Sequence, residues 1–163
     1  MSKFFGKFVY AFTPINGDDK AHGNPALVVF GDPNENEIKL ISTESKIKLN
    51  GELMALPIIA FVKEIGNNEY NIKYRFCTGM PINICGHGTV AAAKAIAESK
   101  NITTKSEIIF HLEQCFKENR KFPTIKVETD GYYFNVNFQS FTYSKPHSVL
   151  TDTYFFSFKI QYI

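Results

Sequence analysis

A run of small apolar residues from Val90 to Glu98 (VAAAKAIAE) constrains the fold more than any other part of the chain. Alanine is the strongest helix former, and here it occupies nearly every side of the predicted helix. A helix that is apolar almost all round is usually buried, and its small side chains let strands approach closely. We therefore expect a central helix with a curved sheet wrapped round it. A surface helix with a wide alanine face is the open alternative.

Short stretches rich in aromatic and β-branched residues, separated by Gly, Pro, Asn and Asp, predict strands on both sides of this helix. The predicted strands are residues 4–12, 26–30, 57–62, 70–76, 108–110, 124–129 and 132–138. Apolar and polar residues alternate along 70–76, so we expect one face of that strand to be wet. Asp130-Gly131 predicts a tight two-residue turn between the last two strands.

A second helix is predicted over residues 35–47, because Ile38 and Ile41 recur at helical spacing and Asn34 or Asp32 can cap its start. With the central helix and the strands, this gives an α+β fold. We expect a mixed or antiparallel sheet that curves round the central helix.

Composition limits the class of protein. A chain of 163 residues favours one domain, because domains commonly hold about 100 to 150 residues. The net charge of +2 is too balanced for a nucleic-acid partner. The three cysteines form no CxxC pair, which favours a reducing, cytoplasmic location. No apolar stretch approaches the roughly 20 residues of a membrane span, so no membrane association is expected.

Five residues at the start of the central helix form the main candidate site: Cys85, Gly86, His87, Gly88 and Thr89. The glycines let a ligand approach the backbone, and the first-turn amides with the helix dipole suit a carboxylate or phosphate. A cysteine there should have its thiolate favoured, as a nucleophile or a proton-transfer base requires. Taken alone, the segment is structural as readily as functional.

Other chemistries find less support in these residues. Cys85 and His87 have no further ligands at metal spacing, so no metal site is expected. The glycine pattern lacks the full GxxxxGK[ST] or GxGxxG form of a nucleotide site. His22, His111 and His147 are interpreted as turn, surface or packing residues.

Several segments in series resemble the phenazine-biosynthesis PhzF-like family of the diaminopimelate epimerase fold. The matching pieces are residues 10–13 (YAFT), 23–29 (GNPALVV), 60–62 (AFV) and 85–89 (CGHGT) with the alanine helix after them. The resemblance covers about residues 6–98. It implies two similar halves, each a sheet round a central helix, with the active site in the cleft between them.

The resemblance also implies a function. The family's members are isomerases and epimerases that move a proton on small carboxylic acids without a cofactor. By this resemblance Cys85 is the catalytic base, and Asn24, Gly86, His87, Gly88 and Thr89 bind the substrate. A carbon-bound proton next to a carboxylate is weakly acidic, so a base and anion-stabilising amides are the groups that such chemistry needs.

Two departures from the family pattern concern the catalytic groups. Where the PhzF branch carries a glutamate before the Ala-Phe-Val strand, this chain has Ile58. Glu52 is the nearest upstream carboxylate and is the second catalytic candidate, although its use requires a local shift of register. Residues 77–84 also differ from the family's usual sequence.

The resemblance extends over the first half of the family's fold. We expect residues 1–140 to form a PhzF-like N-terminal half-domain and residues 141–163 to be an atypical tail, with the second half absent through truncation. One hypothesis is an isomerase in which a homodimer rebuilds the cleft, placing one Cys85 on each side of the substrate. The alternative is a catalytically silent remnant or a small-anion binding module. A third hypothesis is an incomplete chain whose exposed half-interface drives association.

Overall fold

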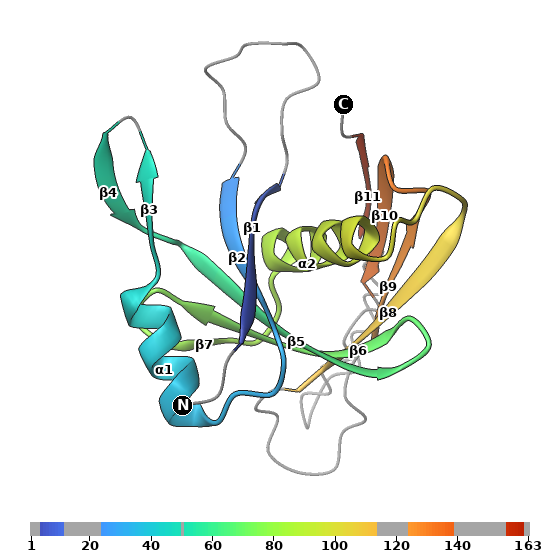
Figure 1. Cartoon of the computed structure of the whole chain (residues 1–163). Helices are drawn as coiled ribbons and strands as arrows, with labels where there is room; N and C mark the ends of the chain where they lie inside the picture. Colours follow the sequence, from blue (N-terminus) through green and yellow to red (C-terminus); the bar gives the residue numbers. More distant parts are fainter. Residues whose placement is uncertain (1–3, 12–23, 50, 114–123, 139–155, 162–163) are drawn as a thin grey trace, which may run out of the picture.

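The computed structural model describes residues 4–11, 24–49, 51–113, 124–138 and 156–161 (Figure 1). The described elements, in chain order, are β1 (Phe5–Ala11), β2 (Asn24–Phe30), α1 (Glu35–Glu44), β3 (Lys46–Leu49), β4 (Glu52–Ala55), β5 (Ile58–Gly66), β6 (Glu69–Phe76), β7 (Pro81–Ile82), α2 (Gly86–Ser99), β8 (Ser106–Leu112), β9 (Thr124–Thr129), β10 (Tyr133–Phe138) and β11 (Phe156–Gln161).

One large mixed sheet carries the fold. Its strand order is β1-β2-β5-β6-β8-β9-β10-β11, with the short β7 paired to β6. The β2–β5 and β6–β8 pairs are parallel, and the other neighbours are antiparallel. The sheet curls so that α2 contacts β1, β2 and β5 toward one end and β10 toward the other (Figure 1). The predicted α+β fold, with a mixed sheet round a helix, is confirmed.

Helix α2 is the centre of the main core. Its alanines and Ile96 are at most 1% exposed, and they pack against side chains from β1, β2, β5, β6, β8, β9 and β10. An alanine-rich surface lets the curved sheet come close on several sides, which a helix with larger side chains would prevent. The surface-helix alternative is therefore wrong.

Helix α1 covers the other face of the sheet. Ile38 packs with Val29, Ile59 and Phe61 in a second, smaller core. Strands β2 and β5 are thus buried on both faces, which explains their near-continuous apolar sequences. Asn34 caps α1 as predicted: its side chain accepts hydrogen bonds from two first-turn amides, and Glu37 completes a capping box.

The prediction of a helix over 35–47 is wrong at its C-terminal end. The helix ends at Glu44, where Ser45 caps it through its backbone amide and its hydroxyl, both bonded to the Ile41 carbonyl. The chain continues into the β3–β4 hairpin, a separate two-stranded sheet. Gly51 in its turn has a φ of 89°, a left-handed conformation that suits glycine.

The expected wet face of β6 is also only partly correct. Tyr70, Ile72 and Tyr74 are buried against α2 as the alternation predicts. On the opposite face, however, Arg75 is only 6% exposed, because Glu35 at the start of α1 holds its guanidinium in two hydrogen bonds of 3.0 and 3.1 Å. The polar residues of this face are therefore covered by charged partners.

The last strands extend the sheet beyond the predicted elements. Residues 130–132 connect β9 to β10, so the turn holds three residues rather than two. Strand β11, within the predicted tail, pairs antiparallel with β10. The half-domain boundary near residue 140 stays a prediction. In the part of the chain that the structure describes, no helix is both long and apolar enough to cross a membrane.

Candidate active site

Five of the predicted site residues, Cys85 to Thr89, lie where β7 leads into α2. Cys85 is the N-cap of the helix, with extended backbone angles. Its Sγ accepts a hydrogen bond from the Gly88 amide at 3.3 Å, and the His87 amide also donates to it. The side chain is half-buried against the main core. This places a thiol, rather than the usual hydroxyl or amide oxygen, on the unpaired amides of a helix start.

Burial decides the protonation of this thiol. It raises the pKa of Cys85 above the ordinary value of a cysteine, and the two backbone amides oppose the shift only in part. The prediction of a favoured thiolate is therefore wrong. Withdrawal from water outweighs the helix start, and Cys85 is a protonated thiol at neutral pH.

His87 is held in place by Asn24, the first residue of β2. Its Nε2 lies 2.9 Å from the Asn24 carbonyl oxygen, which can only accept, so the ring carries a hydrogen on Nε2. Burial lowers the pKa of His87, although the hydrogen bond to Asn24 opposes this. The imidazole is therefore neutral at pH 7. The structure thus brings Asn24 and His87 together, through the Asn24 backbone.

Gly88 and Thr89 face the interior. A Cβ at Gly88 would lie 2.7 Å from the Tyr74 ring and 3.2 Å from Ile58, so only glycine fits there. The Thr89 hydroxyl donates to the Cys85 carbonyl at 2.8 Å and pairs with the Tyr74 hydroxyl at 2.5 Å. The role of Thr89 as a substrate contact stays a prediction. Its hydroxyl is engaged inside the protein, in the two hydrogen bonds to Cys85 and Tyr74.

Tyr74 is the residue of this site that the sequence did not single out. It is completely buried, and burial raises the pKa of its hydroxyl, so the group stays protonated. Through Thr89 it holds the Cys85 carbonyl and hence the first turn of α2. The sequence signal was present: a tyrosine on the buried side of an amphipathic strand requires a hydrogen-bond partner.

Two positions were considered for a catalytic carboxylate, Ile58 and Glu52, and neither places a carboxylate beside Cys85. Ile58, at the start of β5, lies in the main core beside Gly88. This position is therefore close to the start of α2, but it holds an apolar side chain. Glu52 begins β4 with an exposed side chain, and Figure 1 shows the tip of this hairpin well apart from the start of α2. The structure does not bring Glu52 to Cys85.

The other cysteine and histidine that the structure describes do not belong to this group of residues. Cys77 is half-buried after β6, and His111 contacts Glu69 at 3.1 Å on the sheet. Among the described residues, no group of three or more His, Cys, Asp and Glu side chains is arranged to hold a metal ion. Cys115, His22 and His147 lie outside the described residues.

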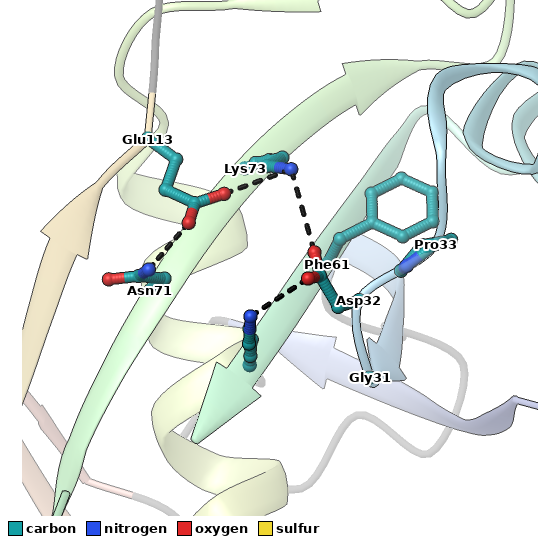
Figure 2. A pocket seen from close by; sticks show the side chains of 8 residues that line it. Gly31, Asp32, Pro33, Phe61, Asn71, Lys73 and Glu113 are labelled. Carbon is teal, nitrogen blue, oxygen red and sulfur yellow. Dashed lines mark hydrogen bonds and ion pairs between the residues drawn. The ribbon is translucent and has the colours of Figure 1, made fainter. Parts of the chain in front are cut away.

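A charged network on the α1 side of the sheet encloses a cavity of about 10 Å³, large enough for one water. Figure 2 shows Lys73 between the carboxylates of Asp32 and Glu113, with Asn71 bonded to Glu113. Lys63 also pairs with Asp32, and this hydrogen bond is the main cause of the lowered pKa of Asp32. The network joins β5, β6, the residue after β8 and the loop after β2.

Comparison with known proteins supports the fold. A phenazine biosynthesis PhzF family protein from Enterococcus faecalis is 20% identical, with a TM-score of 0.59 over 82% of this chain and 43% of its own. A phenazine biosynthesis PhzC/PhzF protein from Clostridium difficile is 25% identical, with a TM-score of 0.51 over 76% of this chain and 42% of its own. A predicted epimerase from Pseudomonas aeruginosa is 13% identical, with a TM-score of 0.53 over 82% and 42%.

This chain therefore spans less than half the length of the solved structures that it matches. No curated protein gives a significant match. The family model described as phenazine biosynthesis-like protein matches residues 9–129, which include β2, β5 and the whole of α2 with Cys85. Since this match covers most of the chain, the protein belongs to the PhzC-PhzF family of phenazine biosynthesis-like proteins.

Proposed function

We propose that this chain supplies one half of a proton-transfer site, in a cofactor-independent isomerase or epimerase that acts on a small carboxylic acid in the cytoplasm. The observation that carries the proposal is the position of the Cys85 Sγ, which caps α2 with two backbone amides donating to it. Family membership and the similarity to a predicted epimerase support the class of reaction.

The site suits proton transfer at a carbon next to a carboxylate. A base on one face of the substrate takes the proton, and the electron pair of the broken C–H bond moves into the carboxylate as an enolate. The start of α2 offers that negative charge the positive end of a helix dipole. Because Cys85 is protonated, it acts first as the acid: its S–H proton passes to the carbon, and a thiolate remains on the two amides.

This step requires a base on the opposite face. We propose that the base is the Cys85 of a second copy of the chain, whose thiol has lost its proton to solvent before it takes the α-proton of the substrate. The segment that leads into Cys85 exposes Phe76, Met80 and Ile84. Exposed apolar side chains grouped together are typical of an interaction surface. A twofold axis beside them would place a Cys85 on each side of the substrate.

The test measures deuterium incorporation at the α-carbon of small amino and hydroxy acids in heavy water, followed by NMR. We expect exchange with at least one compound, and Cys85→Ser should lower its rate by about a hundredfold or more. Thr43→Ser is the control and should leave the rate unchanged, because Thr43 lies on the exposed side of α1, outside the site and outside the segment that leads into Cys85. Equal rates in the wild type and Cys85→Ser would refute the catalytic role.

The second candidate function is binding of a small anion without turnover. Ile58 favours it, since no carboxylate occupies this buried position beside Gly88. This function predicts that carboxylates such as malonate raise the unfolding temperature while no compound exchanges its α-proton. Exchange that depends on Cys85 would exclude it.

A further inference from the structure

A second cavity lies at the C-terminal end of α2, the opposite end from Cys85. It has a volume of about 520 Å³, within the range of small-molecule sites. Its lining comes from the ends of β2 and β5, from β6, and from Ser99 and Lys100 at the end of α2. Among the described residues, this cavity and the site at Cys85 share no side chain.

The lining carries both signs of charge beside an apolar wall. Lys63 pairs with Asp32 at 2.8 Å, and Lys100 pairs with Glu64 at 2.7 Å, so two cations and two anions face the cavity. Phe30, which is only partly buried, adds apolar surface beside them. Ion pairs this exposed contribute little to the stability of the fold. A charged group of a ligand can therefore replace one member of either pair at a small cost in free energy.

Tyr70 provides an independent sign of a ligand. The residue is 2% exposed, and its hydroxyl has no well-formed hydrogen bond among the residues that the structure describes: the Lys100 ammonium interacts with it, but that ammonium pairs with Glu64 at 2.7 Å. A buried polar group without a well-formed hydrogen bond is rare and unfavourable. The Lys100 ammonium lies 5.3 Å from the centre of the Tyr70 ring, so the long, partly exposed Lys100 side chain covers it. A ligand that drew Lys100 aside would reach the hydroxyl.

We propose that this cavity binds a free amino acid with an apolar side chain. A purely anionic ligand would be repelled by Asp32 and Glu64, and a purely cationic ligand would be repelled by the two lysines. A zwitterion satisfies both: its carboxylate replaces an acid on Lys100 and accepts from the Tyr70 hydroxyl. Its ammonium pairs with the Glu64 carboxylate, near the negative end of the α2 dipole. The apolar side chain then lies on Phe30.

The first experiment measures binding to the full chain by NMR titration, with three probes that differ only in charge. L-Phenylalanine is the zwitterion, 3-phenylpropionate lacks the ammonium, and phenethylamine lacks the carboxylate. We expect phenylalanine to bind at least about tenfold tighter than either. Its shifts should centre on the amides of Ser99 and Lys100. Equal binding of 3-phenylpropionate, or no binding of phenylalanine at millimolar concentration, would overturn the proposal.

The second experiment separates binding from structure. Tyr70→Phe removes a buried hydroxyl that has no well-formed hydrogen bond, so the ligand-free protein should unfold at the same or a higher temperature while affinity falls about fivefold. Lys100→Gln should lower affinity about tenfold, and Lys105→Gln, with the same charge change outside the cavity, should not. Cys85→Ser should bind normally, which separates this site from the proposed active site. Wild-type affinity in Tyr70→Phe and Lys100→Gln would refute the assignment.

Discussion

At the scale of single residues, the protonation of Cys85 determines the direction in which the proposed proton transfer begins. Burial raises the pKa of its thiol, so the folded state is favoured below the ordinary thiol pKa, and this contribution is lost as the pH rises through the raised value. In a variant with Cys77→Ser and Cys115→Ser, the rate of alkylation by iodoacetamide should show a midpoint above about 8.5. Unfolding in urea should return the midpoint to the ordinary value. A midpoint at or below 8.5 in the folded protein would contradict the burial argument.

Gly88 is the second residue whose replacement has a defined consequence. An alanine Cβ there meets the Tyr74 ring at 2.7 Å and Ile58 at 3.2 Å, inside a core that cannot yield easily. Gly88→Ala should lower the free energy of unfolding by about 1–3 kcal/mol, although alanine favours helix more than glycine does. Urea denaturation measures the change. Gly66→Ala is the control, because its Cβ would be 3.5 Å from the nearest atom. A neutral Gly88→Ala would show that the start of α2 is loosely packed.

At the scale of elements, strands and helices with a regular hydrophobic repeat were predictable from the sequence. Features that interrupt such a repeat were not. Strands β2, β5 and β6 and helix α2 follow their hydrophobic patterns closely. The β3–β4 hairpin was missed, because the helical spacing of Ile38 and Ile41 was extended through Ser45 to residue 47, and the turn signal in Asn50-Gly51 was not used. The burial of Arg75 was unpredictable, since it depends on Glu35, which is 40 residues away in the chain.

The link between Arg75 and Glu35 joins β6 to α1 and can be tested as a unit. Glu35→Ala leaves the guanidinium buried, and among the described residues it keeps a hydrogen bond to the Tyr74 carbonyl at 3.1 Å. We expect a loss of about 1–3 kcal/mol in the free energy of unfolding, measured by urea denaturation. Glu44→Ala removes an exposed acid from the far end of α1 and should change it by less than about 0.5 kcal/mol. Equal effects of the two variants would show that the buried ion pair adds no stability.

At the scale of the whole molecule, the placement of the candidate residues at a helix start was predictable, but their connections were not. Residues 85–89 could be placed there because glycines and a cysteine before an alanine-rich run are recognisable from sequence, while their role as a site stays a prediction. Their partners are 15 to 63 residues away, as in the pairs of Thr89 with Tyr74 and of His87 with Asn24. Sequence spacing does not show which strands the sheet brings to the helix, nor that burial would outweigh the two backbone hydrogen bonds at Cys85.

The composite site makes the last prediction, because a second copy of the chain has to complete it. Light scattering of the reduced protein over a concentration series should give twice the mass of one chain, and Phe76→Lys, in the exposed apolar segment, should shift the mass toward the monomer. Lys126→Glu, on an exposed part of β9, is the control and should leave the dimer intact.

Where exchange is measurable, an equal mixture of wild-type and Cys85→Ser chains should keep roughly a quarter of the activity if both thiols are needed, and about half if each chain works alone. A monomer at every concentration would exclude the two-cysteine site, because one Cys85 then faces the substrate from one side only.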